Sequence, residues 1–436
     1  MPQLPKSTDG TLNVRHSGAM GDGRTDDSPA IQAALDQTDG GLFFPGGDYL
    51  LRSGLRLDMS ARGRTHICGA GARLLNASDG PALHIMGTHE GTSSPGSVTE
   101  QTWARELMPV IRDIEIAGVG DCGDGIVLEG TFKAVISGVI IHGCRNGIRL
   151  ARRNRDIIVS DSDLYRNRQV GVLYDHVSLH QSIIIGCHIS HNGLSGIKID
   201  GGDIRNVQIT GNDIEYNYTE GVGVCADVWF VVGPPPGTGI REATISGNTI
   251  QAMRTEGGAN IRIEGREDAR SQKAGLIAIS GNMITSQDYN IWAQNARAVT
   301  ISANTFLLGS ARNLWLGDCR HISVTGNVID DIPDYGGQTC GGIELVSCIG
   351  CHIGGTIVAG ATPGHGQAAI ALQQCQTCSV NGCQVLGQPL AAVELRDCVA
   401  CWVSGCLLQR PQGDDCEPLP VHGGSGNSVC GNQVVP

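Results

Sequence analysis

Charged side chains alternate with apolar ones in short segments near the middle of the chain. In the segment from Gly196 to Asp200, Ile197 and Ile199 alternate with Lys198 and Asp200. Successive side chains of a strand point to opposite faces, so an inward pair of isoleucines leaves the lysine and the aspartate outside. An ammonium group beside a carboxylate can neutralise an acidic ligand and take part in proton transfer. The pattern predicts a reaction site on the outer face of a strand.

The same register, applied to the equivalent segments, gives nine candidate site residues, and Trp229, from a predicted loop insertion beside them, is the tenth. The predicted catalytic residues are Lys198, Asp200, Asp175, Arg262 and Glu264, and the predicted substrate-binding residues are Arg149, Trp229, Trp292, Trp315 and Glu344. No metal-binding residue is predicted. Each charged residue taken alone is also explained by an ordinary ion pair between strands. Two tryptophans on one exposed strand face are harder to explain in this way, which favours a site.

The elements that position these residues belong to a repeat. A short turn sequence, Gly186-Cys187, returns as Gly211-Asn212 after 25 residues, and variants of this Gly-Asn turn continue along the chain. Each repeat holds two or three short segments with a period of two and none periodic enough for a long helix. Repeats of this length bury their apolar side only by stacking. The sequence therefore predicts an all-β, single-domain right-handed parallel β-helix of about twelve coils with an N-terminal capping helix.

The second residue of the Gly-Asn turn is expected to point inward. Amide side chains stacked in this way can bond to the backbone of the next coil, since every buried polar group needs a partner. The asparagines of this ladder are Asn212, Asn248, Asn282, Asn304, Asn327 and Asn432.

Seventeen cysteines include three Cys-x-x-Cys pairs with the spacing of a zinc knuckle. The pairs begin at Cys348, Cys375 and Cys398, which are equivalent positions of successive repeats. Stacked, buried thiols explain this coincidence better than zinc does. We therefore expect no stoichiometric zinc and mostly reduced thiols. Reduced thiols in such number favour a cytoplasmic location.

Composition excludes several classes of partner. The chain has 436 residues and a formal net charge of -12, so its overall field repels nucleic acid and anionic membranes. A solenoid grows by repetition, so this length still predicts one domain. The first residues, MPQLPKSTDG, show no charged-then-apolar leader, and no apolar run reaches about 18 residues. We expect neither a nucleic-acid nor a membrane partner.

The N-terminal region carries the most specific signal. Residues 13–50 read NVRHSGAMGDGRTDDSPAIQAALDQTDGGLFFPGGDYL, in which Asp27 or Ser28 can cap a helix that has Pro29 in its first position. This predicts a segment of residues 1–41 that caps a β-helix over residues 42–436. The region closely resembles the N-terminal signature of the pectate-lyase-like superfamily of glycan lyases, glycoside hydrolases and tailspikes. The resemblance implies the fold, and it implies carbohydrate chemistry as the activity.

Insertions into the repeat indicate where a ligand would bind. Two of them, Ala226 to Gly239 and Gly265 to Gly275, fall in the same turn of successive coils, and Asp331 to Cys340 and Gly360 to Gln367 fall in the turn at the other end of the same strand. Insertions in a repeat protein usually build its binding face. We expect these loops to flank a groove whose floor holds the candidate residues.

Three chemistries fit these residues. In a lyase of the resembled superfamily, Arg262 or a calcium ion held by Asp175 and Asp200 would neutralise a sugar carboxylate, and Lys198 or Arg262 would abstract the neighbouring proton. The superfamily's common calcium and arginine motifs are not recognisable in this sequence. In a glycosidase, Asp175, Asp200 and Glu264 would supply the acid and the base or nucleophile. In an isomerase or cyclase, a small molecule would lie between Trp229, Trp292 and Trp315.

A fourth interpretation is a non-catalytic tailspike or adhesin that binds a glycan. The expected partner is therefore an oligosaccharide or a small-molecule substrate, and a homo-oligomer is compatible with the sequence. No cofactor is predicted except calcium, for which the aspartates of the lyase scheme and the group Asp22, Asp26 and Asp27 are candidates. An ordered loop and a helix cap are the alternative role of that N-terminal group.

Overall fold

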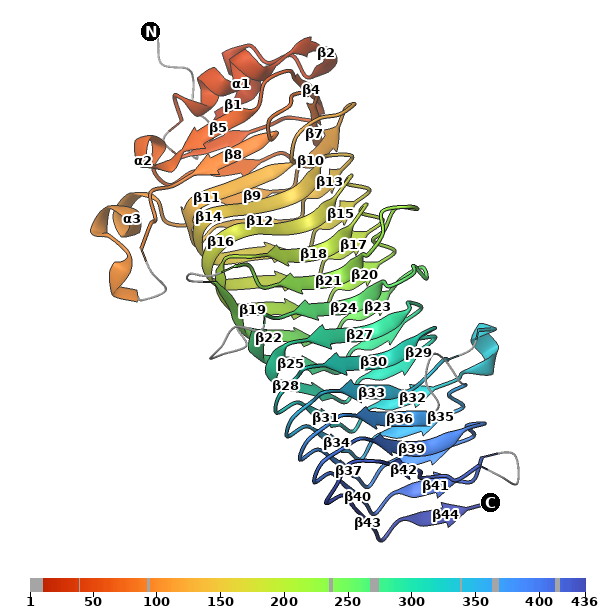
Figure 1. Ribbon diagram of the computed structural model, residues 1–436. Coiled ribbons are helices and arrows are strands. Elements are labelled where there is room, and N and C mark those ends of the chain that lie inside the picture. The colour runs from red at the N-terminus through yellow and green to blue at the C-terminus, as the bar shows by residue number, and fades with distance from the viewer. Residues whose placement is uncertain are drawn as a thin grey trace. The chain divides into compact units, whose positions relative to one another are not determined.

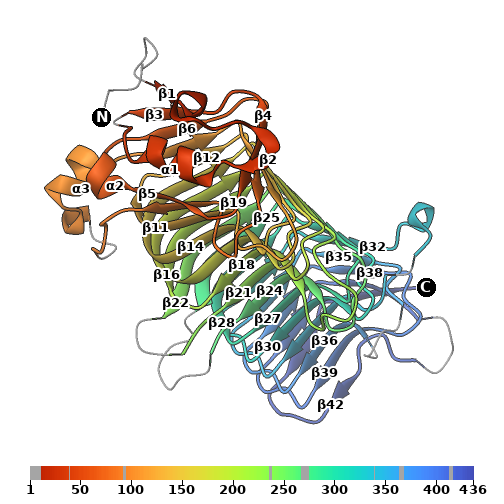
Figure 2. The ribbon, with the colours of Figure 1, turned by 90° about the horizontal axis from the view of Figure 1, so that it is seen from above.

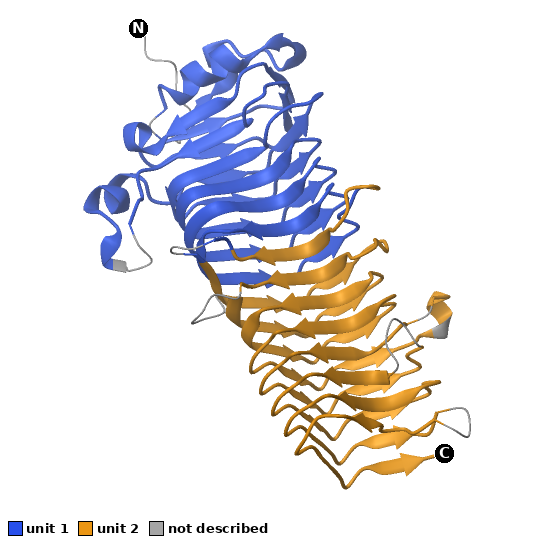
Figure 3. Cartoon of the chain, in the orientation of Figure 1, with its two compact units in different colours: residues 1–219, 233–238 blue, residues 220–232, 239–436 orange. Residues whose placement is uncertain are grey.

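The protein is a parallel β-helix in which short strands form three faces (Figure 1). The computed structural model describes residues 11–38, 40–91, 95–234, 238–266, 274–337, 339–362, 368–411 and 416–436. The chain divides into two compact units, coloured separately in Figure 3: unit 1 holds residues 1–219 and 233–238, and unit 2 holds residues 220–232 and 239–436. The same three faces recur in both units.

Unit 1 forms its faces from strands that pair in parallel from one turn to the next. Face 1 consists of β5 (Leu55–Asp58), β8 (Leu83–Met86), β11 (Ile126–Phe132), β14 (Asn146–Ser160), β16 (Val170–Ile185) and β18 (Ser195–Asp200). Face 2 consists of β1 (Thr11–Asn13), β3 (Gly41–Phe43), β6 (His66–Cys68), β9 (Val110–Arg112), β12 (Val135–Ser137), the later parts of β14 and β16, and β19 (Asp203–Thr210). Face 3 consists of β2 (Asp22–Asp26), β4 (Gly47–Leu51), β7 (Ala72–Asn76), β10 (Glu115–Gly118), β13 (Ile140–His142), β15 (Asp163–Tyr165), β17 (His188–Ser190) and β20 (Asp213–Glu215).

Unit 2 repeats this plan. Its face 1 consists of β21 (Ala226–Val231), β24 (Ala259–Glu264), β27 (Tyr289–Gln294), β30 (Arg312–Gly317), β33 (Ile343–Val346), β36 (Ala368–Gln373), β39 (Ala391–Arg396) and β42 (Val421–His422). Its face 2 consists of β22 (Gly239–Ser246), β25 (Ala274–Ser280), β28 (Ala296–Ser302), β31 (Ser323–Thr325), β34 (His352–Gly354), β37 (Ser379–Asn381), β40 (Trp402–Ser404) and β43 (Ser428–Cys430). Its face 3 consists of β23 (Thr249–Gln251), β26 (Met283–Thr285), β29 (Thr305–Leu307), β32 (Val328–Asp330), β35 (Ile357–Ala359), β38 (Gln384–Leu386), β41 (Leu407–Gln409) and β44 (Gln433–Val435).

The protein has about sixteen turns, because face 3 contributes one strand per turn and its strands number 16. The predicted number of about twelve was wrong. It counted Gly-Asn turns, and the first four turns, which hold β2, β4, β7 and β10, use other turn sequences. At Gly211 the turn adopts a left-handed conformation with φ +62°, which favours glycine. Asp161 and Ala303 take the same conformation at equivalent positions, so the turn tolerates other residues.

Among the described residues, α-helices are few and lie at the N-terminal side of unit 1. They are α1 (Ser28–Leu35), α2 (Met59–Arg62) and α3 (Glu100–Arg105), and short 3-10 segments occur at η1 (Val14–Ser17), η2 (Pro95–Ser97) and η3 (Pro333–Tyr335). The predicted helix is present as α1, but it begins at Ser28, so that Pro29 is its second residue, and Asp27 makes no side-chain cap bond to it. Helix α1 buries Ile31 and Leu35 and packs against η1 and β5 (Figure 2). The helix therefore covers the apolar interior of the first turns.

The N-terminal aspartates order their loop through the backbone. The buried carboxylate of Asp27 accepts hydrogen bonds from the backbone N–H groups of Met20 (2.6 Å) and Gly21 (3.0 Å). Asp22 accepts from the N–H groups of Arg24 and Thr25, and Asp26 accepts from Ser28. Each carboxylate thus satisfies local donors, which is the loop-ordering role considered for these residues.

Ladders of asparagine side chains run inside the turns. In unit 2, Nδ2 of Asn282 donates to Oδ1 of Asn304 at 2.9 Å, and Nδ2 of Asn304 donates to Oδ1 of Asn327 at 3.0 Å. These bonds confirm the ladder predicted from the Gly-Asn turn. Unit 1 contains a second ladder that the sequence analysis missed, at the turn before face 1, where Asn167 bonds to Asn192 and Asn192 to Asn217.

The cysteines of the three Cys-x-x-Cys pairs are buried and stacked, as predicted. The thiols of Cys348 and Cys375 donate to the carbonyl oxygens of Leu316 and Leu345, at 3.3 and 3.4 Å, and Cys398 donates to Leu372 at 3.3 Å. Each thiol therefore bonds to the backbone of a neighbouring turn. All cysteines of the described residues are free thiols.

Candidate functional site

The ten candidate residues fall into two groups, one in each unit. Unit 1 holds Arg149, Asp175, Lys198 and Asp200, and unit 2 holds Trp229, Arg262, Glu264, Trp292, Trp315 and Glu344. All ten lie on face 1. Nine of them follow the register that the alternation predicts, and the tenth, Trp229, lies in a strand where a loop was expected. Each group forms its own network of contacts.

In unit 1, a chain of charges crosses β14 and β16. Asp124, at the turn before β11, is fully buried, and its carboxylate accepts from Arg145 (2.7 Å from Nη2) and from Nε of Arg149 (2.8 Å). Nη1 of Arg149 donates to Oδ2 of Asp175 at 3.0 Å. Arg149 is thus fixed between one buried and one half-exposed carboxylate, and its guanidinium still reaches the surface. The sequence analysis missed Asp124, whose signal was an aspartate directly before the apolar segment of β11.

His176 extends this chain of charges toward solvent. Its Nδ1 lies 3.0 Å from Oδ1 of Asp175, and its side chain is 68% exposed. Because a carboxylate only accepts, Nδ1 is the nitrogen that donates in this contact, and in the neutral imidazole the lone pair then lies on Nε2. The ring lies against Gly201 of the following turn, where a Cβ would come within 3.0 Å of Cδ2. The sequence analysis also missed His176. This residue takes a left-handed conformation inside β16, with φ +46°, and the regular alternation of face 1 ends just before it.

Lys198 and Asp200 form the next pair on the same face. Nζ of Lys198 lies 2.9 Å from Oδ2 of Asp200, and only 14% of the lysine side chain is exposed. In the strand register, Lys198 is opposite Leu173 and Asp200 is opposite Asp175. The structure therefore brings Arg149, Asp175, Lys198 and Asp200 onto three neighbouring strands.

The carboxyl groups of this face are held in the ionised form. Burial alone would raise the pKa of Asp175, but hydrogen bonds from His176 and Arg149 lower it below its ordinary value. Burial is likewise outweighed at Asp124, where hydrogen bonds from Arg145 and Asn146 lower the pKa. The pKa of Glu129 is also lowered, against the effect of burial, by Arg152 and His84. Fixed negative charges therefore lie beside Arg149 at neutral pH.

In unit 2, three tryptophans and an arginine form a stack. The guanidinium carbon of Arg262 lies 3.8 Å above the ring centre of Trp292 and 5.9 Å from that of Trp229. Trp292 stacks on Trp315 with 5.0 Å between ring centroids and an interplanar angle of 13°. Both faces of Trp292 are therefore occupied by protein groups. Nε of Arg262 donates to Oε1 of Glu264 at 2.5 Å, and Nε1 of Trp229 donates to the same oxygen at 3.2 Å.

Neighbouring groups fix both ends of the stack. A Cβ at Gly317 would lie 2.2 Å from Cη2 of Trp315, so the ring rests on the backbone of its own strand. Oε2 of Glu344 accepts from Nε of Arg312 at 3.1 Å, and Oε1 accepts from Gln373 at 2.8 Å. Arg312 is buried, with 2% of its side chain exposed. These contacts give Arg262, Glu264 and Glu344 internal partners.

One predicted insertion was misplaced. Residues 226–231, expected to begin a loop, form the face-1 strand β21, in which Trp229 is opposite Arg262. The apolar alternation of Val222 and Val224 had suggested that the strand began earlier. These two valines are 41% and 40% exposed, and Gly221 and Gly223 beside them take left-handed conformations that interrupt a strand. Of the other predicted groove loops, residues 235–237, 267–273, 338 and 363–367 lie outside the described residues.

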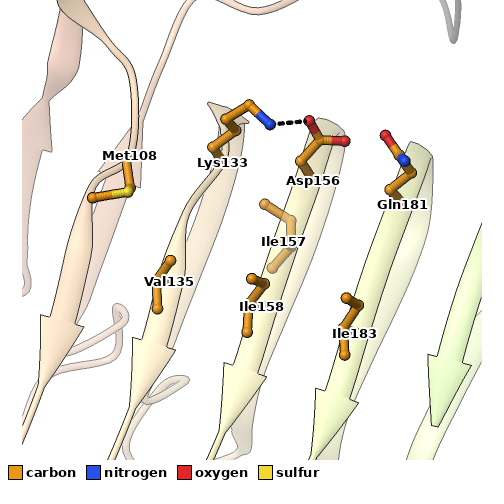
Figure 4. Close-up of a pocket in the computed structure, with 8 residues that line it drawn as sticks. All are labelled: Met108, Lys133, Val135, Asp156, Ile157, Ile158, Gln181 and Ile183. Carbon is orange, nitrogen blue, oxygen red and sulfur yellow. Dashed lines mark hydrogen bonds and ion pairs between the residues drawn. The ribbon is translucent and has the colours of Figure 1, made fainter.

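A pocket of about 340 Å³ lies on face 2 of unit 1, where no site was predicted (Figure 4). Val135, Ile158 and Ile183 line its floor from three neighbouring strands. At its upper end, Nζ of Lys133 lies 2.8 Å from Oδ2 of Asp156, and Gln181 and Met108 complete the rim. The pocket is mainly apolar, in contrast to the charged surface of face 1.

Stacked parallel strands around an apolar interior, with inward asparagine and cysteine columns, define a β-helix protein. The family model of the right-handed β-helix region matches residues 102–228 and 237–408, and the chain belongs to this family. A second family model, described as rhamnogalacturonase A/epimerase, pectate lyase-like, matches residues 11–95. This match confirms the N-terminal resemblance to the pectate-lyase-like superfamily. No curated protein matches the sequence.

Solved structures with the same fold come from enzymes and from phage proteins. The A-module of the mannuronan C-5 epimerase AlgE6 of Azotobacter vinelandii has a TM-score of 0.50 and 15% identity, covering 97% of this chain and 99% of that one. The tailspike of Escherichia coli bacteriophage HK620, solved with a pentasaccharide, has a TM-score of 0.56 and 12% identity, covering 97% and 80%. At such identities these similarities show the fold alone. None of the helices in the described residues is long and apolar enough to span a membrane.

Proposed function

We propose that the chain is a carbohydrate-active enzyme that removes the proton next to the carboxylate of a uronic-acid unit, on face 1 of unit 1. The observation that carries the proposal is the exposed imidazole of His176, oriented by Asp175, which is in turn bonded to Arg149. An imidazole whose other nitrogen bonds to a carboxylate is a common form of general base. The glycan class is taken from the epimerase and the tailspike complex, which share the fold.

The proposed step needs three groups. Nε2 of His176 accepts the proton from the sugar carbon that bears the carboxylate, and the electron pair left behind is stabilised on that carboxylate. Arg149 and Lys198 supply positive charge to the carboxylate as negative charge develops there. The electron pair then either expels the oxygen on the neighbouring carbon, which takes up a proton from water as the glycosidic bond breaks, or takes up a proton from water on the opposite side. The first outcome is a lyase reaction and the second is an epimerisation.

Glycoside hydrolysis fits this face less well. A glycosidase needs one carboxyl group that stays protonated near neutral pH, which requires a raised pKa. At Asp124, Glu129 and Asp175 the pKa is lowered instead. Proton abstraction supported by cations makes use of ionised carboxylates, because they orient the arginine and the histidine.

Exchange of the sugar proton with solvent tests the proposal. Acidic polysaccharides are incubated with the enzyme in D2O, and deuterium incorporation beside the carboxylate and unsaturated uronate are both measured. We expect one of these signals for at least one uronate polymer, and at least about a hundredfold loss in His176→Ala and Lys198→Ala, as for loss of a general acid or base. Parallel reactions with calcium and with a chelator test whether the reaction needs calcium.

His191→Ala is the matched control. His191 is also exposed and also takes a left-handed backbone conformation, φ +55°, but it lies beyond the end of β17 on face 3. The variant should keep full activity. The proposal is wrong if no uronate polymer reacts, or if the His176→Ala variant is as active as the His191→Ala variant.

The face-2 pocket favours a second candidate, binding of a small molecule. Its volume of about 340 Å³ and its isoleucine and valine floor suit an apolar ligand of modest size. Ile158→Lys would place a charge on that floor. Thermal-shift screening of apolar metabolites should then give hits that this variant loses and that His176→Ala keeps, and a screen without hits would exclude this candidate.

A further inference from the structure

A histidine and two carboxylates meet on the outer side of face 3 in unit 1. His188 of β17 is opposite Asp213 of β20 in the strand register, and Glu215 follows two residues later on the same side. Nε2 of His188 lies 3.2 Å from Oε1 of Glu215 and 3.7 Å from Oδ2 of Asp213. One donor atom from each of the three residues lies within 4.8 Å of the others. These separations are close to those between ligand atoms around a single small cation, whose bonds are about 2.0–2.2 Å long.

The other nitrogen of His188 also faces a carboxylate. Asp163 of β15 is opposite His188 on the preceding turn, and its Oδ1 lies 3.7 Å from Nδ1. This oxygen is buried and makes no hydrogen bond within the described part of the chain. Metal-binding histidines usually donate their second N–H to a carboxylate, which fixes the tautomer and the ring orientation. The imidazole thus lies between one carboxylate on its Nδ1 side and two on its Nε2 side. In a metal site the first would orient the ring, and the other two would bind the ion together with Nε2.

The cluster is short of positive charge. Three carboxylates, those of Asp163, Asp213 and Glu215, lie within 3.7 Å of the ring nitrogens of His188. Within the described residues, His188 is the only histidine or cation in ion-pair contact with Asp163 or Asp213. A bound divalent cation would compensate the three carboxylates more fully than one imidazole does.

We propose that His188, Asp213 and Glu215 bind one divalent first-row transition-metal ion, and that Asp163 positions the imidazole. Nitrogen and carboxylate ligands together suit zinc, manganese or cobalt, whereas calcium prefers oxygen ligands alone. The three strands β15, β17 and β20 lie side by side in Figure 1, so the ion would link successive turns. Half of the Asp213 side chain and 44% of the His188 side chain are exposed, which leaves coordination positions open to water or a ligand.

Cobalt binding to the full-length, reduced protein tests this assignment, because its spectrum also reports ligand type. We expect one equivalent of Co²⁺ to bind, with the weak visible bands of nitrogen and oxygen ligands and without a thiolate charge-transfer band. Zn²⁺ should displace it. His188→Ala and Glu215→Gln should each weaken binding at least about tenfold. Asp163→Asn should shift the visible bands and weaken binding by about 10–100-fold, while the melting temperature of the metal-free protein stays the same.

The control is His142→Ala. His142 lies on the same face, two turns earlier, and its Nε2 is 3.0 Å from Oε1 of Glu115, but it contacts a single carboxylate and stacks on Tyr165. This variant should bind cobalt as the wild type does. The proposal is overturned if the wild type shows no saturable binding, if the bound cobalt shows a thiolate band, or if both His188→Ala and Glu215→Gln bind with unchanged affinity.

Discussion

Asp124 is the residue on which the charged surface of unit 1 depends. It lies fully buried and accepts hydrogen bonds from Arg145, Asn146 and Arg149, and Arg149 in turn bonds to Asp175. A buried carboxylate is stable only when its charge is compensated and its lone pairs are used. The same contacts that stabilise Asp124 therefore place the guanidinium group where a substrate carboxylate would bind.

The lowered pKa of Asp124 predicts a specific loss of stability in acid. A group whose pKa is lower in the folded state stabilises the fold above its unfolded value of about 3.9, and this contribution is lost as the pH falls through the folded value. Asp124→Asn should cost about 1–3 kcal/mol at neutral pH, because the two arginines lose their shared partner. Melting temperatures measured from neutral pH to about pH 3 should show the two proteins becoming more alike in acid. A constant difference across this range would contradict the prediction.

The sequence predicts which strand residues face outward, but it does not predict which groups they contact. The alternation of Ile197, Lys198, Ile199 and Asp200 fixes which side chains face outward, and it holds for every candidate except Trp229, whose strand was taken for a loop. Register does not show partners that lie where the alternation is interrupted: Asp124 lies in the turn before β11, and His176 lies at a left-handed position inside β16. It also does not show that both faces of Trp292 are covered, since this depends on how Arg262 and Trp315 fold over their own strands.

The asparagine ladder of unit 2 is the element that ties its turns together at one edge. Asn304 makes four ladder bonds: its Oδ1 accepts from the N–H and the side chain of Asn282, and its Nδ2 donates to Ile279 and Asn327. Asn304→Ala leaves buried donors and acceptors without partners and should cost about 1–3 kcal/mol or more. Thermal unfolding measures this loss.

Gln384→Ala is the control for the ladder. Gln384 is an exposed amide in β38 of the same unit. Its removal should leave the melting temperature almost unchanged, as is usual for surface substitutions. If the Asn304→Ala and Gln384→Ala variants had the same melting temperature, the ladder would have no measurable role in stability.

The residues of the metal site proposed on face 3 could not be grouped from the sequence alone. His188 and the pair Asp213 and Glu215 are separated by a whole turn, and the strands that carry them, HIS and DIE, are only three residues long. Strands this short give no periodic signal of their own. Only the pairing of β15, β17 and β20 brings Asp163, His188 and Asp213 into line.

At the scale of the whole molecule, the cysteines give a direct test of the fold. Most are buried, and burial raises the pKa of the Cys187 thiol to about 11, with the Cys225 thiol raised to about 11 as well. Thiols that are buried and protonated react slowly with disulfide reagents. The native protein should therefore show rapid modification of the exposed Cys430 and slow modification of the buried thiols, and all seventeen should react in denaturant.

Cys430→Ser should remove the fastest phase and leave the half-exposed Cys68, Cys340 and Cys416 as the next thiols to react. Metal analysis complements this measurement: any zinc that the protein retains should be lost in His188→Ala, because the cysteine pairs are not expected to bind it. Zinc that stays bound in this variant, together with protected Cys348 and Cys351, would contradict the prediction of metal-free thiols.

The fold class could be predicted because the repeat is expressed twice, in the Gly-Asn turn and in the alternation after it. The number of turns could not be predicted, because turns that lack the Gly-Asn sequence were not counted. The division into two compact units also leaves no mark in the repeat, since the same turn sequence occurs in both, at Gly211 and at Gly247.

The irregular turns at β2, β4, β7 and β10 have a consequence for how the chain finds its native pairing. When repeats are nearly alike, a segment shifted by one whole turn still places isoleucine on isoleucine, so that the shifted state competes with the native one. In the first turns, which lack the Gly-Asn sequence, a shift by one turn would instead lose native pairings such as that of Gly47 to Leu51 with Ala72 to Asn76. We therefore expect the beginning of unit 1 to set the register of pairing, because the turns that follow would align with it in one way.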